Sequence, residues 1–133
     1  MRALISLLAI LSAPLSAADC AALAKLALPT TTITVAADVT EGRFTPPGAA
    51  PIAKLPAFCR VAGAIRPSSD SDIQFEVWLP ASGWNGKFQG IGNGGYAGVI
   101  SYSGLAAALR LGYATASTDT GHRAAGQDAT WAL

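Results

Sequence analysis

The chain has 133 residues, of which nine are basic and eight acidic, so its formal net charge is +1. This length allows one small domain at most. A nearly neutral chain without a basic run has no electrostatic attraction to nucleic acid or to an anionic membrane surface. We therefore expect neither as a partner.

The first 18 residues have the organisation of a signal peptide. Arg2 gives a positive start, residues 3–15 are mostly apolar, and residues 16–18 offer small side chains for cleavage. The apolar stretch is shorter than the ~20 residues that span a bilayer. A buried N-terminal helix is the alternative. We predict a mature protein that begins at residue 19, is secreted or periplasmic, and has no membrane attachment after cleavage.

The sequence contains two cysteines, Cys20 and Cys59. Export leads to an oxidising compartment, where two cysteines pair more readily than they remain free. We predict a disulfide between them, with two free buried thiols as the alternative. Because His122 is the only histidine and no further thiol exists, we expect no metal site.

The N-terminal third predicts one helix, one strand and one irregular segment. Residues Cys20 to Leu28 have helical periodicity, which Pro29 ends. Residues Thr30 to Ala37 are rich in β-branched side chains and predict a strand. Residues Glu41 to Pro56 hold four prolines and two glycines, which indicates an irregular surface segment.

The two clearest strands are Phe58 to Ile65 and Asp72 to Leu79, joined by a turn at residues 66–71. They predict an antiparallel hairpin. The second strand alternates: one face carries Ile73, Phe75, Val77 and Leu79, and the other carries Gln74, Glu76 and Trp78.

A third strand, a helix and a last strand follow. Lys87 to Gly92 predicts the strand, and Tyr102 begins a helix that Ser101 caps and Gly112 ends. Tyr113 to Thr118 is rich in β-formers. Strand, loop, helix and strand make one βαβ unit, so its two strands should be parallel.

The whole pattern predicts an α/β protein: antiparallel hairpin, third strand, glycine loop, helix, parallel strand. An α/β-hydrolase sheet begins in this way. The last strand has no following helix to cover it. We expect residues 19–133 to be a partial α/β-hydrolase domain, truncated before the nucleophile elbow and the lid.

The glycine loop, residues 90–98, has five glycines among nine residues and joins the third strand to the helix. Gly90, Gly92 and Gly95 fit the G-x-G-x-x-G dinucleotide fingerprint, with Asp119 placed as a ribose-binding acid. The polar strand before the loop, and export away from cytosolic cofactors, disfavour that interpretation. A tight connection without chemistry is a further alternative.

An oxyanion hole is the interpretation that we favour for this loop. Backbone N–H groups stabilise the negative oxygen of acyl transfer, and α/β-hydrolases take one such donor from the loop after the third strand. Gly94 and Gly95 are the candidate donors. We expect Tyr96 to lie near the substrate.

Several separate motifs resemble the N-terminal region of the tannase and feruloyl esterase family. They are F-C-R-V (58–61), F-E-V-W-L-P (75–80), G-W-N-G-K-F (83–88), G-N-G-G-Y-A-G (92–98) and G-Y-A-T-A-S-T-D-T-G-H (112–122). The resemblance implies an exported serine carboxylic-ester hydrolase that acts on aryl esters of galloyl or feruloyl type. It also supports the Cys20–Cys59 pairing.

The resemblance also implies what this chain lacks. The family's nucleophile lies in a later G-C-S-x-G-G motif, which these 133 residues do not contain, and its Asp and His come further on. Its calcium site would lie in the lid. We therefore expect no catalytic triad, no metal and no cofactor in this chain, and no activity from it alone. The alternative is a secreted, non-catalytic binding module for a phenolic ligand.

Some side chains invite a catalytic interpretation that we do not adopt. Asp119 and His122 precede the position of a nucleophile, so we expect them to organise the turn after the last strand. Three tryptophans are candidates for an aryl pocket, but core packing is the simpler expectation for Trp78, Trp84 and Trp131.

Overall fold

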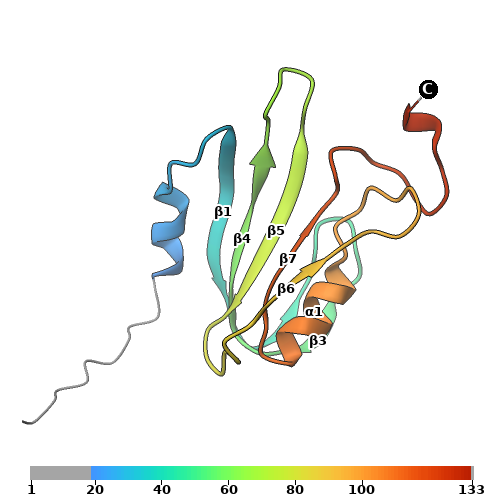
Figure 1. The fold of residues 1–133 in the computed structure, drawn as a ribbon. Helices are drawn as coiled ribbons and strands as arrows, with labels where there is room; N and C mark the ends of the chain where they lie inside the picture. Colours follow the sequence, from blue (N-terminus) through green and yellow to red (C-terminus); the bar gives the residue numbers. More distant parts are fainter. Residues whose placement is uncertain (1–18, 133) are drawn as a thin grey trace, which may run out of the picture.

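The computed structural model of the protein describes residues 19–132. The predicted signal peptide, residues 1–18, lies outside the described residues. Figure 1 shows a twisted sheet with one α-helix packed beside it. The elements in chain order are η1 (Cys20–Lys25), β1 (Thr31–Val39), β2 (Gly42–Phe44), β3 (Ile52–Leu55), β4 (Phe58–Ile65), β5 (Ile73–Pro80), β6 (Phe88–Ile91), α1 (Tyr102–Arg110), β7 (Ala114–Thr118) and η2 (Thr130–Ala132).

The main sheet has five strands in the order β1-β4-β5-β7-β6. Strands β4 and β5 form the predicted antiparallel hairpin, with Ile65 opposite Ile73. Strands β6 and β7 are parallel, with Phe88 opposite Ala114, and α1 connects them. The predicted α/β class and the start of an α/β-hydrolase sheet are confirmed. Strand β7 lies between β5 and β6. After β5 the chain leaves one strand position empty, forms β6 beyond it, and returns through α1 to place β7 in that position.

A disulfide joins Cys20 to Cys59, with 5.6 Å between their Cα atoms. It fixes η1 to the edge of the sheet where β1 pairs with β4. The predicted helix at Cys20 to Leu28 is shorter and tighter than expected: it is a 3-10 helix of six residues, begun by the Asp19 carboxylate, which accepts a hydrogen bond from the Ala21 N–H. So short a segment stays in place through the disulfide rather than through its own hydrogen bonds.

The segment Glu41 to Pro56 was predicted to be irregular throughout, but only residues 45–51 between its two short strands are. Strands β2 and β3 form a small antiparallel sheet in which Phe44 lies opposite Ile52. Leu55 is fully buried in the core. Arg110, at the end of α1, donates hydrogen bonds to the carbonyls of Ala53 and Lys54, at 2.6 and 3.0 Å. Burial of these few apolar side chains against α1 outweighs the turn propensity of the prolines between them.

Helix α1 packs on one face of the sheet and buries an apolar stripe there. Its Leu105, Ala106 and Leu109 pack with Leu55, Phe58 and Trp78 in one core cluster. Gly112 ends the helix with a φ of +79°, as expected. Ser101 holds the N-cap position, but its side chain makes no capping bond. Its N–H instead donates to the Ser117 hydroxyl on β7, at 3.0 Å.

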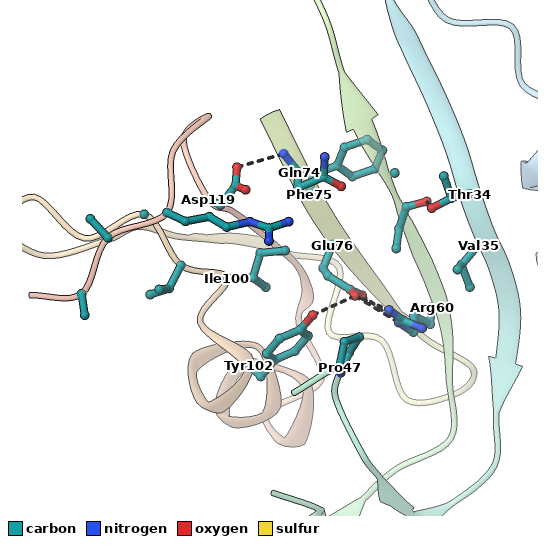
Figure 2. Close-up of a pocket in the computed structure, with 17 residues that line it drawn as sticks. Thr34, Val35, Pro47, Arg60, Gln74, Phe75, Glu76, Ile100, Tyr102 and Asp119 are labelled. Carbon is teal, nitrogen blue, oxygen red and sulfur yellow. Dashed lines mark hydrogen bonds and ion pairs between the residues drawn. The ribbon is translucent and has the colours of Figure 1, made fainter. Parts of the chain in front are cut away.

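The polar-looking face of β5 is the more deeply buried one, because α1 and the β2–β3 sheet pack there. Glu76 is only 1% exposed. Its carboxylate accepts hydrogen bonds from the Arg60 guanidinium and from the Tyr102 hydroxyl at 3.3 Å (Figure 2). It also accepts one from Trp78 Nε1 at 3.0 Å. This network ties β4, β5 and α1 together through one charge. A buried carboxylate is tolerated only when it is paired in this way.

Replacing Glu76 tests how much the fold depends on that network. Glu76→Gln removes the charge and turns an amide NH₂ toward donors, so we expect the free energy of unfolding to fall by about 3 kcal/mol. The control is Arg66→Gln, which breaks the exposed Arg66–Asp72 ion pair and should cost less than about 1 kcal/mol. Urea denaturation of both variants measures the difference. Equal losses would show that the buried network carries no special weight.

The stability contributed by the same network should depend on pH through the Tyr102 hydroxyl. Burial, followed by the nearby Glu76 charge, raises the pKa of the Tyr102 hydroxyl to about 12. Because the folded state holds this proton more tightly than the unfolded state, the stabilisation is complete below pH 10 and is lost as the pH rises toward 12. An absorbance titration of phenolate, wild type against Tyr102→Phe, should assign the last ionisation to Tyr102. Ionisation of Tyr102 near its ordinary pKa would contradict this.

Candidate functional site

Two loops meet where the parallel strands end. The glycine loop leaves the carboxyl end of β6, and residues 119–128, here called the β7 tail, leave the carboxyl end of β7 (Figure 1). The Tyr96 N–H donates to the Gly126 carbonyl, and the Gly98 N–H donates to the Ala124 carbonyl, each at 3.0 Å. The tail therefore runs against the loop and holds it by backbone hydrogen bonds.

A tight turn occupies the middle of the glycine loop. The Ala97 N–H donates to the Gly94 carbonyl at 3.2 Å, and Gly95 has a φ of +61°. A side chain at Gly95 would be strained by that φ and would lie 2.7 Å from the Gln127 amide. Glycine is required here by the turn and by the β7 tail. Tyr96, the next residue of the turn, is 54% exposed.

The amides of Gly94 and Gly95 are the predicted oxyanion donors. Among residues 19–132, no acceptor receives a hydrogen bond from either N–H, and both glycines are exposed. A side chain at Gly94 would meet open space. The turn therefore presents two unengaged donors side by side. That Gly94, Gly95 and Tyr96 contact a substrate stays a prediction.

Two further contacts fix the loop, and neither was foreseen from the sequence. Asn93 donates from its side-chain amide to the Thr118 carbonyl at the end of β7, at 2.9 Å. Gly98 lies so close to the backbone carbonyl of His122 that no larger residue fits. The glycine at position 98 was the available signal, since close backbone approach is a common reason for glycine.

Asp119 has the turn-forming role that was predicted for it. It is 6% exposed, and its Oδ1 accepts a hydrogen bond from the Gln74 N–H at 2.9 Å (Figure 2). The same oxygen accepts a second hydrogen bond, from the Gly121 N–H at 3.0 Å. This carboxylate is thus committed to the backbone of β5 and of its own turn, which disfavours a ribose-binding role. Helix α1 also begins only at Tyr102, seven residues beyond Gly95, whereas a dinucleotide fingerprint leads directly into its helix.

His122 was predicted to organise the turn after β7, and it also contacts the glycine loop. Its Nε2 lies 2.9 Å from the Tyr96 carbonyl oxygen, inside the glycine loop. The ring stacks on Trp131, with 3.8 Å between ring centroids. The prediction of core packing is confirmed for Trp78, which is fully buried. It is wrong for the other two tryptophans, because Trp84 is 60% and Trp131 48% exposed.

A cavity of about 680 Å³ lies over strands β1, β4 and β5, beside residues 98–102 and the β7 tail (Figure 2). Its walls include Arg60, Glu76, Tyr102, Asp119 and Arg123. Glu76 and Asp119 are already hydrogen-bonded within the chain, so both carboxylates in the cavity wall have structural roles. It is not the site at which we place the chemistry.

Metal ligands and membrane spans are both absent from the described part of the chain. Across residues 19–132, no three His, Cys, Asp or Glu side chains gather as metal ligands would. In the same range, no helix has the length and apolar character needed to cross a bilayer.

Comparison with known proteins assigns the chain to a family. The model of the tannase and feruloyl esterase family matches residues 59–133. An uncharacterized esterase of Xanthomonas campestris pv. campestris is 50% identical over 132 residues, which are 99% of this chain and 23% of that protein. A probable feruloyl esterase B-1 of Aspergillus oryzae is 44% identical over 72 residues, which are 54% of this chain and 13% of that protein.

A solved structure agrees with these relatives. The crystal structure of feruloyl esterase B from Aspergillus oryzae matches with a TM-score of 0.71 and 34% identity, over 78% of this chain and 22% of that one. The chain spans less than a quarter of the length of these relatives. Sequence motifs, sheet topology and these matches agree: the chain belongs to the tannase and feruloyl esterase family.

Proposed function

We propose that this chain is the N-terminal part of an exported serine carboxylic-ester hydrolase, in which it supplies the oxyanion loop. One observation carries the proposal: the Gly94 and Gly95 amides are unengaged within residues 19–132 and lie in the loop after a parallel strand. Esterases of this fold take an oxyanion donor from the equivalent loop. The family assignment supports ester hydrolysis as the reaction.

The reaction proceeds through a negative oxygen that needs these donors. A serine attacks the ester carbonyl while a histidine takes its proton, and the carbonyl oxygen becomes an anion in the tetrahedral intermediate. Each preorganised N–H stabilises that anion by ~3 kcal/mol. The serine, histidine and aspartate come from polypeptide outside these 133 residues, which contain no G-C-S-x-G-G motif.

We base the proposed substrate class on the names of the matched relatives. Because feruloyl esterases match this chain, we propose an aryl ester of galloyl or feruloyl type as the substrate. The exposed ring of Tyr96 stands beside the candidate donors and provides an aromatic surface for such a group. No cofactor is proposed for this chain, and the family's calcium site would belong to a lid.

Export is supported by the disulfide. Cys20 and Cys59 are bonded, as in proteins of oxidising compartments. We propose that the mature protein is secreted or periplasmic, with neither nucleic acid nor a membrane as its partner.

A binding module for a phenolic ligand is the second candidate, favoured by the exposed rings of Tyr96 and Trp131 near the glycine loop. The reading frame after Leu133 separates the two. A frame that continues into G-C-S-x-G-G supports the esterase, and an authentic stop codon supports the module.

The purified 133-residue chain should release no p-nitrophenol from a short acyl ester, because it contains no catalytic triad. Release that survives re-purification would contradict this expected inactivity.

Loss of one donor tests the oxyanion loop directly. Gly94→Pro removes the Gly94 N–H and places a ring beside the Gly95 amide, so kcat of the complete esterase on methyl ferulate should fall about 100-fold or more. The matched control is Gly92→Ala, because a methyl group at Gly92 also meets open space. We expect the control to retain wild-type kcat. An unchanged kcat in Gly94→Pro, with a folded enzyme, would rule out the Gly94 amide as an oxyanion donor.

A further inference from the structure

We infer that His122 is a positioning residue for the oxyanion loop. Its ring hydrogen-bonds the turn that carries the Gly94 and Gly95 amides, although it lies more than twenty residues later in the chain. The inference rests on the proposed function and adds to it a side chain that determines where those amides point.

The hydrogen bond acts on the peptide unit that closes the turn. The Tyr96 carbonyl, which accepts from His122 Nε2 at 2.9 Å, and the Ala97 N–H belong to one planar peptide. That same N–H donates to the Gly94 carbonyl at 3.2 Å and completes the turn. Fixing one end of a rigid plane fixes the other, so His122 limits rotation of the Gly94–Ala97 turn and hence of its free amides.

The ring is itself held in place from two sides. Trp131 stacks on it with an interplanar angle of 20°, and the Thr120 hydroxyl lies 3.2 Å from Nδ1. The backbone of His122 packs directly against Gly98, at the far end of the same loop. His122 is therefore a fixed support for the loop rather than a side chain that happens to lie near it.

The direction of the hydrogen bond separates this role from acid–base chemistry. A carbonyl oxygen only accepts, so Nε2 must carry the proton and donate it. In that state Nε2 has no lone pair with which to take a proton from a nucleophile. Its partner is a backbone group of the loop and not a reacting atom, so His122 acts through the turn.

The loop keeps other ties when the ring is removed. The Tyr96 and Gly98 N–H groups donate to the β7 tail, and Asn93 donates to Thr118, without help from His122. Variants at His122 should therefore fold, with the turn present but less closely fixed. A small displacement of catalytic donors lowers the rate of reaction without lowering the affinity for substrate.

Two substitutions separate the two properties of the His122 ring, its stacking on Trp131 and its hydrogen-bond donor. His122→Phe keeps an aromatic ring to stack on Trp131 and removes the donor. His122→Gln keeps a donor at nearly the same reach and removes the aromatic ring. The control is Arg123→Gln, an exposed neighbour with no hydrogen bond to the loop among the described residues. All three are made in the complete esterase, and kcat, KM and the melting temperature are measured with methyl ferulate.

We expect kcat of His122→Phe to fall by about tenfold or more, with KM and melting temperature close to wild type. His122→Gln should recover kcat to within about threefold of wild type, because the donor is restored. Arg123→Gln should match wild type. This pattern supports positioning by the hydrogen bond.

Other outcomes overturn the inference in distinguishable ways. An active wild-type enzyme whose His122→Phe variant keeps its kcat overturns the role of His122 alone. Equal losses in the Phe and Gln variants, together with a lowered melting temperature, assign His122 to stability only and also overturn it. A complete protein that hydrolyses no ester overturns the proposed function, and the inference falls with it.

Discussion

The parallel pairing of β6 with β7 is the constraint on which the site depends. Parallel strands end at the same edge of a sheet, so the loops that follow them must leave side by side. The glycine loop follows β6 and the β7 tail follows β7, and backbone hydrogen bonds join them through Tyr96 and Gly98. An antiparallel arrangement would place the two segments at opposite edges, and the turn at Gly94 and Gly95 would lose its support.

The buried Glu76 network keeps that edge in place from within. Helix α1 connects β6 to β7, and its first residue, Tyr102, donates to Glu76 on β5. Arg60 brings β4 into the same network. Trp78, which also donates to Glu76, fills the core beneath the helix. The polar network and the apolar core therefore hold the same helix, which begins just after the glycine loop.

The sequence predicted the hairpin, the βαβ unit and the fold class because alternation and helical periodicity are local patterns. It failed where long-range packing decides. Phe44, Ile52 and Leu55 pack in the β2–β3 sheet against a core cluster built by β4, β5 and α1. Glu76 is a polar residue on the deeper face, and two of its partners, Arg60 and Tyr102, come from the distant elements β4 and α1. At the site, glycine content indicated the loop, but the contact of His122 with Tyr96 joins residues too distant for any local pattern.

The central claim is that the turn at Gly94 and Gly95 points its amides at the oxygen that becomes negative during ester hydrolysis. A crystal structure of the complete enzyme with a phosphonate bound to its serine measures this directly. We expect a phosphonyl oxygen about 2.7–3.1 Å from the Gly94 or Gly95 nitrogen. A phosphonyl oxygen held by other groups, with both of these amides turned away from it, would contradict the account.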